Sequence, residues 1–136
     1  MEQKNCKHPR SYVDSKEKLT RFIYEESHIR NRVSQAVFKQ ASDNTFSVYR
    51  TNNISPEHIW NICDEFVDGE RSDGKKSCGR AEILADAFIK NALIFNPNGK
   101  PHTRHVDVLG WNPNKPDDLQ RRNNLAALAI PYTRPN

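Results

Sequence analysis

The run His102–Trp111 holds the residues whose types and spacing are best suited to chemistry in this chain. It places His102, Arg104 and His105 at the start of a short apolar segment that ends in Gly-Trp. An imidazole exchanges protons near neutral pH, and a guanidinium binds anions such as phosphate. Functional groups gather where loops meet a rigid strand, so the run predicts a binding or catalytic pocket. It matches no complete reaction motif.

Two strands, at 46–50 and at about 104–109, are expected to position these groups, because β-branched and aromatic residues alternate in the first and apolar residues recur in the second. Residues two apart share a face of a strand, so each apolar face ends in an arginine, Arg50 in one strand and Arg104 in the other. If the strands pair, the two guanidiniums are expected to converge on a phosphate. The alternative is a structural role for each, with a carboxylate or backbone carbonyls as its partner.

The other face of the second strand carries His105 and Asp107, again two residues apart. A carboxylate beside an imidazole fixes its tautomer and raises its basicity, which suits a general base. The alternative is an ordinary pair at the rim of the sheet. Because Arg104 and His105 lie on opposite faces, one pocket holds both only if the strand twists or bulges.

Neither a metal ion nor another cofactor is predicted. His102 and His105 with Cys63 or Cys78 would supply zinc ligands, but structural zinc sites have closely paired ligands and these thiols stand alone. The loop at 73–77 lacks the glycine and lysine spacing of a phosphate loop and follows no apolar strand.

Composition narrows the class of protein. The 136 residues favour one domain, and a net charge of +4 permits an anionic partner but is mild for a dedicated DNA-binding domain. Residues 1–10 lack an apolar signal segment, and no run approaches the roughly 18 apolar residues of a membrane span. The three cysteines are too widely spaced for a disulfide framework. We therefore expect a soluble, cytoplasmic protein without a membrane partner.

The expected organisation is a flexible tail at 1–13 and a single α+β domain at 14–136. The clearest element is a helix in which Ser55 suits the N-cap and Pro56 the first helical position. Apolar residues then recur along one face of this helix, and Gly69 is its expected end.

The other elements follow from periodicity and turn residues. They are a short helix or helix-to-strand transition from residue 14 or 15, a short strand at 33–38, a turn at 42–44, a loop at 70–79, a strand at 79–83, a short helix at 84–91, a strand at 93–95, and a last helix from 117 with Leu119, Leu125 and Leu128 on its inner side. Strands and short helices alternate without long crossovers. This pattern favours an α+β fold, a small mixed or antiparallel sheet with three to four short helices packed on it.

Several short motifs follow one another along residues 20–111. They are Arg21-Phe22-Ile23, His28, Arg32-Val33, Ala36 with Phe38, Ser47-Val48-Tyr49-Arg50, Ser55 with Ile59-Trp60, Arg80-Ala81, Leu93, and His105 with Gly110-Trp111. The ordered series resembles a family of short, uncharacterised bacterial proteins. The resemblance implies a bacterial, cytosolic, single-domain protein and carries over no catalytic role, since that family has no established activity. The polar N-terminus and the loop at 67–79 depart from the family pattern.

The favoured function is a non-enzymatic binding or accessory protein that recognises an anionic ligand, a nucleic acid or a nucleotide, through a basic pocket. The guanidiniums would bind phosphate, and the aromatic residues would offer stacking surfaces for bases. The predicted ligand-binding residues are Arg50, Arg104, His105, Arg21, Tyr49 and Trp111.

Two alternatives remain open. One is a protein–protein interaction module in a multi-protein bacterial system. The other is a metal-independent RNase-type toxin, which needs a base, an acid and a cation that stabilises the phosphate. The residues that would supply these groups are His105, Arg50, His28 and Tyr49.

Overall fold

The computed structural model describes residues 12–41, 43, 45–112 and 115–135. Its strands are β1 (Lys18–Ile23), β2 (Ser47–Arg50), β3 (Gly79–Leu84), β4 (Ile94–Asn96), β5 (His105–Leu109) and β6 (Ile130–Thr133). They form one six-stranded sheet in the order β4-β5-β2-β1-β3-β6, with every neighbouring pair antiparallel.

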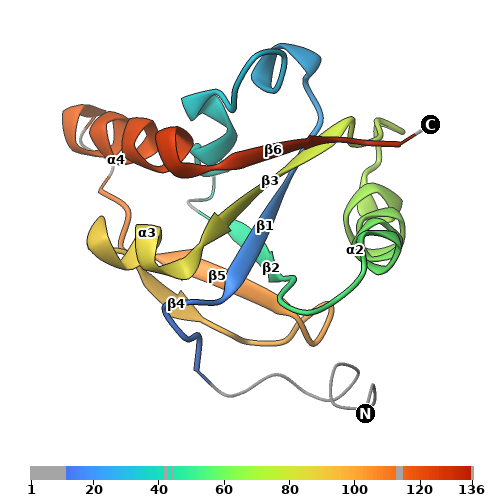
Figure 1. Ribbon diagram of the computed structural model, residues 1–136, viewed down its shortest axis with the longest axis horizontal. Helices are drawn as coiled ribbons and strands as arrows, with labels where there is room; N and C mark the ends of the chain where they lie inside the picture. Colours follow the sequence, from blue (N-terminus) through green and yellow to red (C-terminus); the bar gives the residue numbers. More distant parts are fainter. Residues whose placement is uncertain (1–11, 42, 44, 113–114, 136) are drawn as a thin grey trace.

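Helices cover both faces of this sheet. They are α2 (Pro56–Ile62), α3 (Ala85–Lys90) and α4 (Lys115–Leu128), with the short turns η1 (Glu26–His28), η2 (Gln35–Phe38), η3 (Cys63–Val67) and η4 (Asp68–Glu70). In Figure 1, α3 and α4 lie on one side of the sheet and α2 on the other. The expected α+β fold, an antiparallel sheet with a few short helices, is thereby confirmed.

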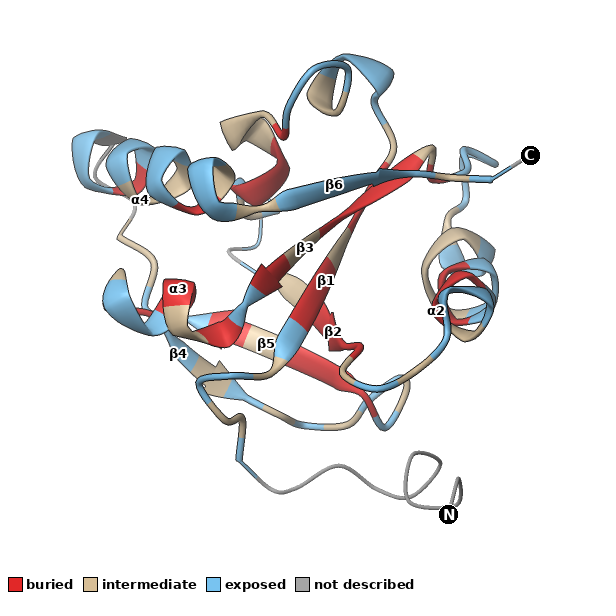
Figure 2. Cartoon of the chain, viewed as in Figure 1, coloured by how far each residue is buried: buried red, intermediate tan, exposed pale blue. Residues whose placement is uncertain are grey.

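Each face of the sheet has its own apolar core. The larger core lies between the sheet and α3, α4 and η2, and it includes the fully buried Leu19, Val48, Phe88 and Leu125. The smaller core lies under α2 and contains Phe22, Tyr49, Ile59, Trp60, Ile62 and Cys63. Figure 2 shows buried residues along the central strands and mostly exposed residues on α4 and β6.

The capping pattern predicted for the clearest helix is confirmed in α2. The Ser55 side chain accepts a hydrogen bond from the His58 backbone N–H at 3.1 Å, and Pro56 stands at the start of the helix. The helix continues through η3 and η4, so the chain stays helical up to Glu70, one residue past the expected end at Gly69. The predicted strands at 46–50, 79–83, 93–95 and 104–109 and the helix at 84–91 correspond to β2, β3, β4, β5 and α3.

Four predictions need correction. Residues 18–23 are a strand, β1, which pairs with β3 along its whole length, and no helix precedes it in residues 12–17. The segment 33–38 is not a strand, because Ser34 accepts a hydrogen bond from the Ala36 N–H and begins the helical turn η2. Strand β6 was not predicted, since its exposed residues show no buried face. The turn at 42–44 and the tail at 1–13 lie mostly outside the described residues.

The fourth correction concerns α4, whose expected inner face is mostly exposed. Leu125 is fully buried, but Leu119 is 42% and Leu128 60% exposed. Polar contacts dock the helix instead, because the buried Asp118 accepts hydrogen bonds from the Gln40 side chain and the Asn112 backbone N–H.

The side chain of Arg21 lies at the point where β1 and β2 stop pairing. The two strands pair only through Leu19 with Arg50 and Thr20 with Tyr49. At the next position Arg21 donates from Nη1 to the Ser47 carbonyl at 2.9 Å and from Nε to the Val37 carbonyl at 3.2 Å. A side chain thus satisfies a backbone carbonyl that a longer ladder would have paired.

The burial of α4 predicts unequal effects of two leucine substitutions. Leu125→Ala should lower the free energy of unfolding by about 3 kcal/mol, because it leaves a cavity in the larger core. Leu128→Ala should cost less than about 0.5 kcal/mol, because that side chain is largely exposed. Urea denaturation of both variants measures the difference, and equal losses would contradict the described packing of α4.

Candidate functional site

Arg50 is engaged in a structural ion pair. Its buried guanidinium donates to both oxygens of the Glu17 carboxylate, from Nε at 2.9 Å and from Nη2 at 3.0 Å, and Nη2 also contacts the Tyr12 carbonyl. Arg104 lies on the same face and donates from Nη1 to the Arg50 carbonyl at 3.2 Å. The two arginines are neighbours, as the strand pairing predicts, but a carboxylate and a carbonyl take contacts that were expected to go to a phosphate.

Two other predicted residues also lie away from a shared pocket. Trp111 packs against Phe46, with 5.2 Å between ring centroids, and donates from its indole N–H to the Val108 carbonyl. His28 ends η1, where its backbone carbonyl accepts a hydrogen bond from the Ser34 N–H.

The remaining three predicted ligand residues do come together. A cavity of about 330 Å³ on the α2 side of the sheet, here called the aromatic pocket, is lined by Arg21, Phe22, Tyr24, Ser47, Tyr49, Phe66, Val67, Glu70, Pro101 and His105. Its position follows from the register, because Tyr49 of β2 stands directly opposite His105 of β5. The two rings meet edge to face, with 5.3 Å between centroids.

Hydrogen bonds fix the tautomer of His105. The Asn98 amide donates from Nδ2 to Asp107 at 2.8 Å, so its oxygen faces the imidazole and accepts from Nδ1 at 2.9 Å. The same oxygen accepts from the Lys100 backbone N–H, which agrees with this orientation. In the neutral ring the proton is therefore on Nδ1 and the lone pair on Nε2. Burial lowers the pKa of His105, and Asp107 offsets this only in part.

Burial determines the charge states of two further residues at the aromatic pocket, Arg21 and Tyr49. Burial lowers the pKa of Arg21 to about 10, which leaves the guanidinium charged at neutral pH. Burial also raises the pKa of the Tyr49 phenol to about 12, so Tyr49 keeps its proton. At neutral pH the pocket thus presents a neutral imidazole and the exposed Glu70 carboxylate. The Arg21 guanidinium is held by the Ser47 and Val37 carbonyls and stacks on the Phe46 ring of the larger core, 4.1 Å from its centroid.

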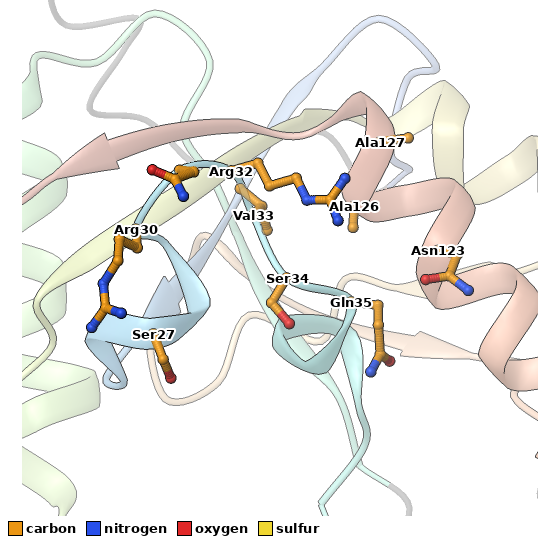
Figure 3. A pocket seen from close by; sticks show the side chains of 10 residues that line it. Ser27, Arg30, Arg32, Val33, Ser34, Gln35, Asn123, Ala126 and Ala127 are labelled. Carbon is orange, nitrogen blue, oxygen red and sulfur yellow. The ribbon is translucent and has the colours of Figure 1, made fainter.

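A second cavity was missed by the sequence reasoning. This cavity, of about 470 Å³ and here called the arginine pocket, lies between α4 and the loop that joins η1 to η2, and is lined by Ser27, Arg30, Asn31, Arg32, Val33, Ser34, Gln35, Asn123, Ala126 and Ala127. Figure 3 shows Arg32 extending toward Ala126 of α4, while Arg30 projects from the loop near Ser27. No carboxylate is among these lining residues.

The loop between η1 and η2 is anchored by Val33 and Ser34 where it meets η2, and its arginines take no part in this anchoring. Val33 is buried in the larger core, and the Ser34 hydroxyl accepts a hydrogen bond from the backbone N–H of Ala36, the second residue of η2. Arg30 and Arg32 both precede this anchor, are exposed, and make no hydrogen bond or ion pair with any described residue. The signal in the sequence was the polar run 30–32, which lies directly before the segment 33–38 that was predicted as a strand.

Other classes of site receive no support in the part of the chain that the structure describes. No group of three or more histidine, cysteine or acidic side chains there could hold a metal ion. None of its helices combines the length and apolar character needed to cross a membrane. Comparison with protein-family models, curated proteins and solved structures finds no match. The resemblance to a bacterial family therefore remains a prediction, and function has to be argued from the two pockets.

The ion pair of Arg50 predicts a stability effect. Arg50→Gln should lower the free energy of unfolding by about 2 to 3 kcal/mol, because the partly buried Glu17 carboxylate loses its cation. Lys90→Gln, which breaks the exposed pair with Asp86, should cost less than about 0.5 kcal/mol. Chemical denaturation measures both. A stable Arg50→Gln variant that no longer binds anions would instead assign Arg50 to a ligand.

The buried His105 and the half-buried His102 predict a loss of stability in mild acid. Burial lowers the folded-state pKa of His102 and His105 below the ordinary 6.5, so the unfolded chain takes up protons first as the pH falls. The free energy of unfolding should therefore be highest above about pH 6.5 and decline below it until the folded pKa values are passed. Denaturation at several pH values should show a smaller decline in His105→Gln, and an unchanged decline would contradict the buried neutral state.

Proposed function

We propose that this protein binds a phosphate-bearing ligand, a nucleotide or a nucleic-acid strand, through the arginine pocket. The proposal depends on two guanidiniums, Arg30 and Arg32, that make no hydrogen bond or ion pair with any described residue and line a polar cavity without a carboxylate. An arginine fork matches the oxygens of a phosphate and binds it through charge-assisted hydrogen bonds.

Several other arginines of the fold form ion pairs with carboxylates, in contrast to Arg30 and Arg32. Arg71 is paired with Asp73, Arg134 with Asp64 and Asp68, and Arg50 with Glu17. Their charges are thus largely balanced within the fold. Arg30 and Arg32 have no carboxylate partner in the part of the chain that the structure describes, so their charge is available to an anion from solution.

The remaining lining residues suit the phosphate group rather than a base. Ser27, Ser34 and Asn123 provide hydroxyl and amide groups that donate to phosphate oxygens, and no aromatic side chain lines the cavity. Arg122 stands next to it and donates from Nε to the Gln35 side chain at 2.7 Å. Recognition by such a cavity would depend on charge and would be insensitive to base sequence.

Titration of the full chain with a fluorescent single-stranded RNA and a single-stranded DNA, followed by anisotropy at several salt concentrations, tests the proposal. The double variant Arg30→Gln with Arg32→Gln should bind about tenfold more weakly or worse, and its log K against log salt slope should be shallower by about 2. The matched control, Lys16→Gln with Lys90→Gln, removes the same charge from exposed positions outside the pocket and should bind almost like the wild type.

Competition distinguishes the two sources of phosphate. Displacement of the RNA by pyrophosphate or a nucleoside triphosphate at low salt would identify a nucleotide site, whereas displacement only by longer strands would identify a strand site. Equal losses in the double variant and its control would overturn the arginine pocket as the site.

Neither alternative function has a specific observation in its favour. The RNA-cleaving hypothesis requires Arg50 and His105 in one site, but they lie on opposite faces of the sheet and Arg50 is held by Glu17. A partner protein, a bacterial origin and a cytoplasmic location remain predictions.

A further inference from the structure

We infer that the aromatic pocket is a second, separate ligand site that takes an uncharged planar ring carrying N–H groups, the chemistry of a nucleobase. Its residues come from β1, β2, β5 and the η3–η4 segment, and none of them lines the arginine pocket. The inference therefore stands without the proposed function.

The walls of the pocket select a flat apolar ring. Phe22, Tyr24, Tyr49 and Phe66 all line it. Phe22 and Tyr49 hold each other at 6.0 Å between centroids, and Phe66 is braced by the His102 ring at 4.9 Å. Such rigid ring surfaces stack on bases of any sequence, and a cavity of about 330 Å³ accommodates one ring system.

The charges in the pocket exclude ionic ligands. The face of Tyr24 that would attract a cation is already covered by Arg71, whose guanidinium carbon lies 3.7 Å from the ring centroid, so a second cation is repelled there. The Glu70 carboxylate opposes an anion such as phosphate. A neutral ring is the ligand class that meets neither repulsion.

The polar part of the lining combines two acceptors, Glu70 and His105 Nε2, with the hydroxyls of Ser47 and Tyr49. The Glu70 carboxylate and the Ser47 hydroxyl make no hydrogen bond with any described residue. His105 Nε2 carries a lone pair and lies 3.7 Å from Asp107, beyond hydrogen-bond distance. Among the described residues, Arg80 Nε is the buried side-chain nitrogen or oxygen atom that has no hydrogen-bond partner. His105 Nε2 makes no hydrogen bond there either, so this atom must be in contact with solvent. The Glu70 carboxylate and His105 Nε2 call for N–H donors on the ring, and the Ser47 and Tyr49 hydroxyls can donate to its acceptor atoms.

Nucleosides test the inference because they carry a base and no phosphate. We would titrate the ¹⁵N-labelled full chain with guanosine, adenosine, cytidine and uridine and follow amide shifts by NMR. At least one nucleoside should shift resonances around Tyr49, Phe66 and His105 in a saturable manner. Glu70→Gln and Phe66→Leu should each weaken that binding about tenfold, since one removes a charged acceptor and the other a stacking ring.

Two controls separate this site from the proposed phosphate site. Glu57→Gln, an exposed change in the first turn of α2 and outside the pocket, should leave nucleoside affinity unchanged. The variant Arg30→Gln with Arg32→Gln should also keep it, whatever that variant does to RNA binding. The spectra of Glu70→Gln and Phe66→Leu without ligand must match the wild-type fold, which excludes unfolding as the cause of any loss.

The inference is overturned if no nucleoside shifts these resonances at millimolar concentration. It is also overturned if Glu70→Gln and Phe66→Leu bind as tightly as the Glu57→Gln control. Saturable binding of tetramethylammonium in place of nucleosides would contradict it as well, because that result would make the pocket a cage for cations.

Discussion

Both pockets depend on the point at which β1 and β2 stop pairing. After two residue pairs the strands separate, and the Arg21 side chain bridges the gap between the Ser47 and Val37 carbonyls. The hydrogen bond to the Ser47 carbonyl holds the first residue of β2, which lines the aromatic pocket. The other holds η2, which continues directly from the loop of the arginine pocket. A charged side chain thus performs a task that backbone pairing performs elsewhere in this sheet.

The arginines of this chain divide into those that build the fold and those that remain available. The first group consists of Arg21, Arg50 and Arg104, which donate hydrogen bonds to carbonyls or a carboxylate at strand ends. A guanidinium suits these partly buried positions because it stays charged and offers several donors. Arg30 and Arg32 lie on an exposed loop and donate to no carbonyl or carboxylate of the described residues. An arginine of the first group lies where a strand end leaves a carbonyl or carboxylate to be paired, whereas an arginine of the second group lies on a loop. The surrounding structure, rather than a sequence motif, decides which group an arginine belongs to.

Local signals predicted the elements that depend on local chemistry. Ser55 and Pro56 define the start of α2 by capping and proline geometry, and alternation identified β2 and β5. An element that depends on distant partners was missed, because β6 is only four residues long, contains Pro131 and is held by its pairing with β3. The same limit applies to the site. The faces of Arg50 and His105 followed from spacing, but the carboxylate of Glu17, which is 33 residues from Arg50, did not.

The polar docking of α4 has a consequence for motion. Net hydrogen-bond contributions are small, and Leu125 is the helix's one fully buried leucine within the described residues, so α4 should separate from the sheet at a lower free energy than the central strands. Its amide hydrogens would then exchange with solvent through local opening. Because Asn123 and Ala126 of α4 form one wall of the arginine pocket, that opening would dismantle the pocket without unfolding the sheet. Occupancy of the pocket and protection of this helix are thermodynamically linked.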